Sequence, residues 1–365
     1  MTARSATPVA ARGPVKLSCR HVWKVFGSRP AYYFDSEGYS IEPAKLAQRM
    51  RAERHIPAAV DVSFDVHVGE IFVIMGLSGS GKSTIVRCLS RLVEPSAGEI
   101  LLDGEDLLKK SPAELIEIRR HKMGMVFQSF GLLPHLNVID NVAFPLKLQG
   151  LPLVERRRRA ERVIELVGLN GRQASYPHQL SGGQQQRVGI ARSLAVEPEL
   201  WFLDEPFSAL DPLIRRQMQD EFLRIQQVLH KSIVFITHDF LEALRIADRM
   251  AIMRDGLVVQ IGTPAELIVH PADDYVAEFT RDVPLVRVLR AADVVDARAK
   301  RTQRMAEVAA ATTVEGLLPL LARHRSGVAV TRAGGKFCGV ATAQSVIAAL
   351  AHEGERREET AEAQR

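Results

Sequence analysis

Two stretches near the start of the chain alternate between apolar and polar positions. Residues 15–26 begin with such an alternation and continue into β-branched and aromatic side chains, and residues 60–68 alternate throughout. A period of two is typical of strands with one buried face. Residues 71–75 are continuously apolar, which is typical of a strand covered on both faces. We therefore predict two half-buried strands followed by a central buried strand.

The middle of the chain contains two more apolar runs, residues 200–204 and 232–237. They flank an amphipathic stretch from Pro212 to His230, and the order strand, helix, strand predicts a parallel sheet. Further helices are expected at 82–91, 112–120 and 153–167, a hairpin at 98–107 and a strand at 122–128. One apolar stripe is expected along helix 153–167, formed by Val154, Ala160, Val163, Ile164 and Val167, opposite a solvated run of arginines.

Two segments differ from this αβ pattern. Residues 28–58 are first rich in aromatic and turn residues and then form a basic helical pattern that begins at Pro43, so we interpret them as an insertion. The tail, residues 285–351, predicts a helix over 294–309, a second helix over 315–324, a hairpin around Gly334 and a final helix. We expect a loose terminus at 1–14 and a charged tail at 352–365.

Composition and charge narrow the class of protein. The chain has 365 residues, 46% of them hydrophobic and 25% charged, which indicates a globular protein of about two domains. No apolar run approaches the roughly 18 residues of a membrane span, and no secretory signal is evident. Three distant cysteines suggest neither a disulfide framework nor a metal site and fit a reducing compartment. Residues 285–351 carry ten Lys or Arg against four Asp or Glu, so the basic excess lies there.

A glycine-rich segment follows the predicted central strand and precedes a predicted helix. It matches the pattern G-x-x-x-x-G-K-[ST], whose backbone N–H groups and helix N-terminus hold phosphate oxygens. In that pattern Lys82 reaches the β and γ phosphates, and Ser83 offers a hydroxyl to Mg²⁺. The residues of this loop are Gly76, Ser78, Gly79, Ser80, Gly81, Lys82, Ser83 and Thr84.

Two later segments extend this phosphate site. Asp204 and Glu205 end an apolar strand, where Asp204 is expected to hold Mg²⁺ and Glu205 to activate an attacking water. Residues 180–184 read LSGGQ and precede a helical stretch, so their hydroxyl and amides form a second cradle for phosphate. The cradle residues are Ser181, Gly182, Gly183 and Gln184.

These segments together resemble the nucleotide-binding subunit of an ATP-binding cassette (ABC) transporter. The matching motifs are the Walker A loop 76–84, the Q-loop Gln128, the signature 180–184, the Walker B 200–205, the D-loop 208–211 and the switch His238. The resemblance implies a P-loop NTPase fold with a RecA-like α/β core, a helical subdomain at about 112–198 and a cassette covering 15–283. It also implies ATP hydrolysis with Mg²⁺, and Phe26 stacked on adenine.

The same resemblance implies a head-to-tail homodimer with two ATP molecules between Walker A and signature loops. In it Glu205 is the general base, His238 holds the γ-phosphate and attacking water, and Gln128 coordinates Mg²⁺ with Ser83 and Asp204. Asp211 crosses the dimer interface. We interpret the subunit as peripheral on the cytoplasmic face of the inner membrane, bound to integral permease subunits through residues 129–150. A periplasmic or lipid-anchored substrate-binding protein is the further partner, and none is a nucleic acid.

Residues 17–283 are more narrowly similar to ATPases that serve importers of glycine betaine, proline and other quaternary amines, and the insertion 28–58 belongs to this likeness. Members of that group often end in two cystathionine-β-synthase-type (CBS) modules, whereas 285–351 has room for one truncated module. Its basic surface is expected to contact anionic lipid or another tail and to respond to ionic strength, or else to be an ordinary solvated surface. The alternative is a soluble ABC ATPase of translation or DNA maintenance, whose second cassette or long coiled coil is not found here. The sequence leaves the cargo open.

Overall fold

The computed structural model describes residues 13–35, 41–128, 131–302, 305–332 and 334–351. The chain divides into two compact units, and their described residues are 13–259 and 260–351. The predicted boundary at residue 284 lies within the second unit. The two units are described separately.

The centre of the first unit is a sheet in the strand order β10-β9-β3-β8-β7-β6. Its strands are β3 (Ile71–Met75), β6 (Met123–Val126), β7 (Leu200–Asp204), β8 (Ser232–Ile236), β9 (Arg249–Arg254) and β10 (Leu257–Gly262). Every residue of β3, β7 and β8 is buried, which confirms the predicted buried strands. Strands β3, β6, β7, β8 and β9 pair in parallel, so the segments that follow β3, β7 and β8 meet at one edge of the sheet.

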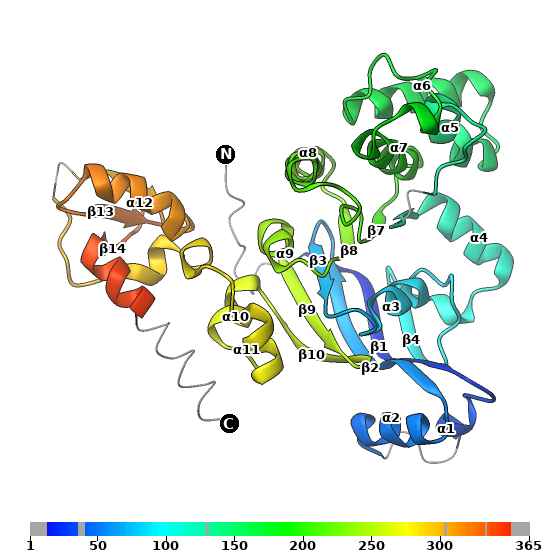
Figure 1. Cartoon of the computed structure of the whole chain (residues 1–365), viewed down its shortest axis with the longest axis horizontal. Helices are drawn as coiled ribbons and strands as arrows, with labels where there is room; N and C mark the ends of the chain where they lie inside the picture. The colour runs from blue at the N-terminus through cyan, green and yellow to red at the C-terminus, as the bar shows by residue number, and fades with distance from the viewer. Residues whose placement is uncertain (1–12, 36–40, 129–130, 303–304, 333, 352–365) are drawn as a thin grey trace. The chain divides into compact units, whose positions relative to one another are not determined.

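A second, antiparallel sheet has the order β2-β1-β4-β5. Its strands are β1 (Val15–Phe26), β2 (Ile56–His67), β4 (Ala97–Leu102) and β5 (Glu105–Asp106), so the predicted hairpin at 98–107 is confirmed. Phe26 pairs with Ile56, and the chain between them leaves the ladder as an excursion. This excursion contains the short helices α1 (Tyr32–Asp35) and α2 (Pro43–Ala52), which Figure 1 shows beside the ends of β1 and β2.

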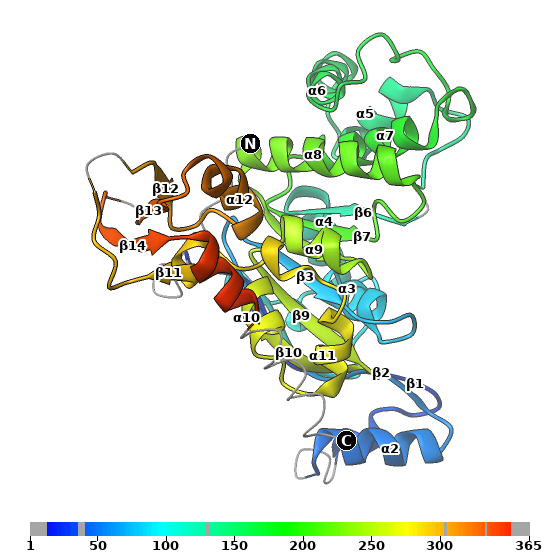
Figure 2. The same cartoon turned by 60° about the vertical axis from the view of Figure 1, so that its left-hand side comes forward.

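The helices of the first unit fall into two groups. Those that cover the central sheet are α3 (Lys82–Leu89), α4 (Pro112–His121), α8 (Pro212–Leu229) and α9 (Phe240–Ile246). The others, α5 (Val138–Leu148), α6 (Leu153–Leu166) and α7 (Gly182–Leu194), gather at one end of the unit in both views (Figures 1 and 2). Strand β6 lies between α4 and α5 in the sequence but belongs to the central sheet, so the predicted helical subdomain is not continuous.

The apolar stripe predicted along α6 is only partly correct. Ala160 and Ile164 are fully buried, and Val167, just beyond the helix, is 1% exposed. Val154 is 81% exposed, so its inclusion in the stripe is wrong. Within the described residues, no helix is both long and apolar enough to cross a bilayer.

The second unit is a small α/β structure with sheet order β11-β14-β13-β12. Its elements are α10 (Pro264–Val269), α11 (Asp274–Thr280), β11 (Val295–Asp296), β12 (Glu307–Ala309), α12 (Val314–Arg323), β13 (Val328–Thr331), β14 (Phe337–Ala341) and a helix over 343–351. The hairpin around Gly334 is confirmed.

The predicted helix over 294–309 is wrong. Two short strands replace it, with Val295 paired to Ala341 and Val308 paired to Val330. Burial of Val308 in the core of this unit requires an extended chain that can pair with β13, and the polar residues between the two strands supply no apolar helical stripe.

Candidate functional site

The glycine-rich loop between β3 and α3 lies tightly against its surroundings. Gly76 has φ of +149°, and a Cβ there would lie 2.3 Å from the Met253 carbonyl oxygen. Gly81 has φ of +98°, and its Cβ would lie 2.0 Å from the Ala58 carbonyl oxygen. Backbone contacts this close exclude any side chain at both positions. Their effect is to hold the loop backbone in one conformation at the sheet edge.

Lys82 and Ser80 are the polar side chains buried within this loop. Lys82 Nζ donates hydrogen bonds to the carbonyl oxygens of Gly76, at 2.8 Å, and Leu77, at 2.9 Å. Burial lowers the pKa of Lys82, while Glu205 and Asp204 oppose the shift. Ser80 Oγ is buried and has no hydrogen-bond partner among the described residues. A buried cation and an unpartnered hydroxyl in one loop fit an anionic, oxygen-rich ligand.

Ser83 and Asp204 join this loop to the end of β7. Ser83 Oγ donates to Asp204 Oδ1 at 2.9 Å. Burial raises the pKa of Asp204, and the hydrogen bond from Ser83 opposes that rise. A hydroxyl and a carboxylate in contact are hard oxygen donors of the kind Mg²⁺ takes together with phosphate oxygens. Among the described residues, no three or more His, Cys, Asp or Glu side chains form a group that could hold a metal ion.

The three predicted catalytic side chains meet at Glu205. His238 Nδ1 lies 3.2 Å from Glu205 Oε2, and Gln128 Nε2 lies 3.4 Å from the same oxygen. Glu205 has φ of +44°, an uncommon conformation for a side chain with a Cβ, and its N–H donates to the Ile236 carbonyl at 3.1 Å. This turn directs the carboxylate to the edge where Gln128 follows β6 and His238 follows β8. The long-range contact between three separate loops therefore matches the predicted grouping.

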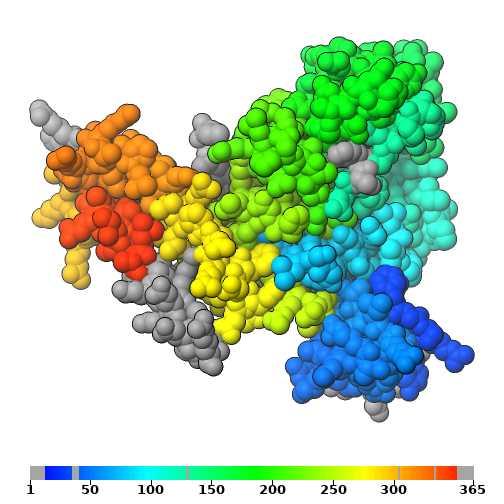
Figure 3. All heavy atoms as spheres, viewed as in Figure 1, coloured from blue at the N-terminus to red at the C-terminus, as the bar shows by residue number. Residues whose placement is uncertain are grey.

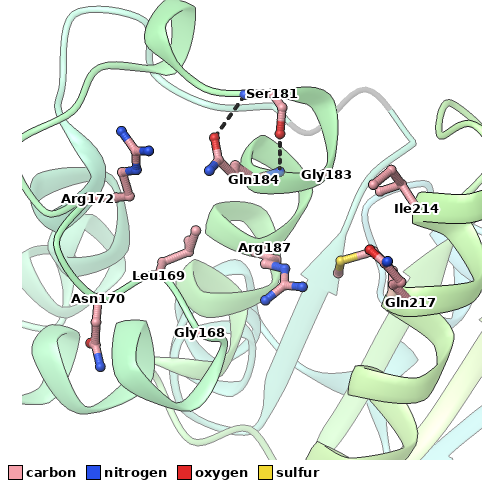
Figure 4. A pocket seen from close by; sticks show the side chains of 11 residues that line it. Gly168, Leu169, Asn170, Arg172, Ser181, Gly183, Gln184, Arg187, Ile214 and Gln217 are labelled. Carbon is pink, nitrogen blue, oxygen red and sulfur yellow. Dashed lines mark hydrogen bonds between the residues drawn. The ribbon is translucent and has the colours of Figure 1, made fainter.

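The signature residues form a second place, at the start of α7. Ser181 and Gln184 make a capping box, in which Ser181 Oγ accepts from the Gln184 N–H and Gln184 Oε1 accepts from the Ser181 N–H. They border a pocket of about 320 Å³ between the 168–172 loop and α8 (Figure 4). Gly183 is buried, and a Cβ there would lie 2.7 Å from Ile214 Cγ2. No hydrogen bond between described residues joins the signature to the Walker A loop.

The D-loop is ordered by a residue that the sequence analysis missed. Asp211 is the N-cap of α8, where its carboxylate accepts from the N–H groups of Leu213 and Ile214. One turn later, the Arg215 guanidinium donates to the carbonyls of Phe207, Ser208 and Leu210 at 3.2 to 3.3 Å. It also lies 3.6 Å from Asp239, next to His238. The position of Arg215, four residues after the N-cap, does not predict from sequence that its guanidinium bonds the D-loop carbonyls.

The remaining predicted site residues lie as follows. Phe26 ends β1 with 44% of its surface exposed, and Lys24 Nζ lies 4.9 Å from its ring centroid. Ser78 and Gly79 are exposed at the tip of the loop, and Thr84 is half-buried in α3.

A buried amide, also missed from sequence, orders the segment after Gln128. Asn141 accepts at Oδ1 from the Leu133 N–H at 2.8 Å, and its Nδ2 donates to the carbonyls of Leu133 and Leu136. These bonds tie residues 131–137 to the first turn of α5. Pro134 is exposed, while Leu136 and Phe144 are half-buried. Residues 129 and 130 lie outside the described residues.

Comparisons with known proteins agree on one family. The sequence profile described as "ABC transporter" matches residues 59–208, which contain four of the six motifs. The "Trimethylamine N-oxide transport system ATP-binding protein TmoW" of Ruegeria pomeroyi is 57% identical over 85% of this chain and 89% of the relative. The "Glycine betaine/proline betaine transport system ATP-binding protein ProV" of Salmonella typhimurium is 45% identical over 92% of this chain and 83% of the relative. Among solved structures, one similar to this chain is described as a dimeric post-hydrolysis state of the ATP-binding cassette MJ0796 bound to ADP and Pi. Its TM-score is 0.57, and it is 32% identical over 68% of this chain and 98% of that chain.

Proposed function

This chain belongs to the ATP-binding subunits of ABC transporters, and from that premise we propose that it hydrolyses Mg-ATP to drive uptake of glycine betaine, proline or a related quaternary amine. The observation that carries the hydrolytic part is the meeting of Gln128, Glu205 and His238 beside the Walker A loop. The relatives carry the transport part, since they are named as ATP-binding proteins of trimethylamine N-oxide and glycine betaine systems. They do not favour a soluble ATPase of translation or DNA maintenance.

Hydrolysis assigns a distinct role to each side chain. The loop amides and Lys82 bind the β and γ phosphates, and Ser83, Asp204 and Gln128 hold Mg²⁺. When bound, the metal neutralises charge on the phosphate oxygens. Glu205 accepts the proton of the attacking water, and His238 orients that water and the γ-phosphate through a side chain already beside the carboxylate.

A homodimer explains why the chain has two phosphate cradles. Ser181, Gly182, Gly183 and Gln184 lie on α7, whereas the Walker A loop precedes α3, and Figure 1 shows the two helices well separated within the first unit. In a head-to-tail pair each signature completes the partner's site, and Asp211 lies at the interface. The solved cassettes that match this chain are described as dimeric. Phe26, exposed at the end of β1, stacks on adenine.

The partners follow from the transport role. The subunit lies peripherally on the cytoplasmic face of the membrane and binds integral permease subunits, while a separate substrate-binding protein selects the cargo. Residues 129–150 are the proposed permease contact, and Asn141 ties the described residues 131–137 of this segment to α5. Residues 285–351 are a truncated CBS-like regulatory domain whose basic surface contacts anionic lipid.

Asn141→Ala is expected to reduce uptake severely while ATP binding stays at the wild-type level. The substitution leaves the Leu133 N–H and carbonyl without their partner, at a cost of about 1–3 kcal/mol, and lets residues 131–137 move. The matched control is Gln226→Ala. Gln226 lies on α8, is an equally buried amide, and bonds the N–H and the carbonyl of Lys231. Uptake and thermal unfolding of both variants are measured. Equal loss of uptake would contradict a specific role of the 131–137 segment.

The transport function is tested by uptake of labelled trimethylamine N-oxide, glycine betaine, choline and proline at low and high osmolarity. Cells lacking the gene are complemented with wild type, Glu205→Gln or a chain ending at residue 284. We expect one cargo to be lost in the deletion strain and restored only by chains with Glu205. Restoration of uptake by the truncated chain with an unaltered response to salt would contradict the regulatory role of the tail. No loss of any cargo would contradict the importer role.

A further inference from the structure

The insertion between β1 and β2 bonds two turns, the one after Phe26 through His55 and the one next to Gly256 through Arg51, and nothing in the proposed function uses it. We propose that this insertion is a clamp on the adenine end of the site, in which His55 is a positioning residue that fixes the turn following Phe26. The inference rests on the proposed ATP site and deepens it, because it assigns the affinity for the base to an element outside the six motifs.

The insertion is built as a small body of its own. A cluster of buried side chains holds it against β1 and β2: Trp23, Val25, Tyr33, Leu46, Ala47, Met50 and Val60. The Trp23 and Phe34 rings pack edge to face at 5.5 Å. Figure 3 shows the segment as a compact blue lobe against the end of the first unit. An element packed into a common core with β1 and β2 can hold a neighbouring turn in place.

His55 is the residue through which this body reaches the adenine side. Its Nε2 lies 2.8 Å from the Ser28 carbonyl oxygen, so this nitrogen is the protonated donor. A Cβ on Gly27, whose φ is +150°, would lie 2.2 Å from the His55 ring, so the imidazole lies directly against the backbone. His55 therefore holds the Gly27–Ser28 turn, which begins at the residue immediately after Phe26.

The His55 ring is held in place by Tyr33, which contacts the ring and its Nδ1. Tyr33 is buried, its ring packs edge to face with His55 at 5.2 Å, and its hydroxyl lies 3.1 Å from Nδ1. The proton of that hydroxyl goes to the Glu53 carboxylate, and Nδ1 lies 3.0 Å from the Glu53 carbonyl oxygen as well. Burial, followed by the bond to Glu53, raises the pKa of Tyr33 to about 12, so the hydroxyl keeps its proton. His55 therefore has a defined orientation and not a freely rotating ring.

Backbone contacts connect this end of the ladder to the phosphate loop. Ala58, two residues beyond Ile56, has its carbonyl against Gly81 of the Walker A loop. Gly256 donates from its N–H to the Ser80 carbonyl at 3.1 Å. Arg51 of α2 donates to the carbonyl of Asp255, next to Gly256, at 2.8 Å. The insertion therefore touches both the turn after Phe26 and the turn that supports the phosphate loop.

The test compares the full chain's affinity for Mg-ATP with its affinity for Mg-tripolyphosphate, which has the phosphates and no base. His55→Ala is expected to raise the Kd for ATP about fivefold to tenfold, the effect of one lost hydrogen bond, and to leave the Kd for tripolyphosphate within about twofold. His55→Gln retains an N–H donor and is expected to recover most of the affinity. In a Phe26→Ala background, His55→Ala is expected to add no further loss, because both act on the same contact.

The matched control is His67→Ala. His67 also bonds a backbone carbonyl, that of Gly13 at 2.9 Å, but at the opposite end of β2, so its loss should change neither Kd. Equal weakening of ATP and tripolyphosphate by His55→Ala, or unchanged binding of both, would overturn the inference while the ATP site stands. If Phe26→Ala leaves the ratio of the two Kd values unchanged, the adenine contact of the proposed function fails, and the inference fails with it.

Discussion

Glu205→Gln is expected to bind ATP as tightly as the wild type and to reduce steady-state hydrolysis by about 10²–10⁴-fold, the contribution of a positioned general base. The amide keeps the size of the carboxylate but cannot accept the proton of the attacking water. Lys82, Ser83 and Asp204 are untouched, so the phosphate contacts remain. Because the closed dimer is opened by hydrolysis in the proposed mechanism, the variant should accumulate as an ATP-bound dimer.

Phosphate release and size-exclusion chromatography with and without ATP measure the two effects. The control is Glu197→Gln, since Glu197 is another glutamate with a left-handed backbone, at φ of +54°, but lies exposed after α7. Its hydrolysis should remain at the wild-type rate, which separates loss of the base from any effect of substitution at a strained position. Full turnover by Glu205→Gln would remove Glu205 as the base.

The central sheet could be predicted because its strands are buried on both faces. Residues 71–75, 200–203 and 233–236 are continuous apolar runs, and a helix between successive parallel strands brings their carboxyl ends to one edge. Asp204 and Ser83 were each expected to hold Mg²⁺ from their motifs, and Ser83 Oγ lies 2.9 Å from Asp204 Oδ1. Here local pattern and topology give the same answer.

Contacts that depend on two unrelated loops could not be predicted in this way. The approach of Ala58 to Gly81, and the bridge from Arg215 to the D-loop carbonyls, involve backbone atoms, which leave no residue-type signal. Val154 satisfied the helical period but lies on a turn that nothing covers among the described residues. In the second unit, Val308 enters the core from a short strand, where a three-residue strand is too brief to show a period.

Ser181→Ala is expected to reduce hydrolysis by about 10²–10³-fold, the effect of removing one donor from a charge-stabilising site. ATP binding by the isolated subunit should be unchanged, because that contact belongs to the Walker A loop of the same chain. In the Glu205→Gln background, the added Ser181→Ala should raise the ATP concentration needed for dimer formation, since the hydroxyl is proposed to contact the nucleotide held by the partner.

Loss of the α7 cap alone would also destabilise the protein, so the control must share that cost. Ser111→Ala meets the requirement, because Ser111 and Glu114 form the same capping box at the start of α4. Each variant should lose about 1 kcal/mol of unfolding free energy. Only Ser181→Ala should lose hydrolysis and ATP-dependent dimerisation. If the two variants hydrolyse ATP equally well, the signature acts as a helix cap and the shared-site dimer is wrong.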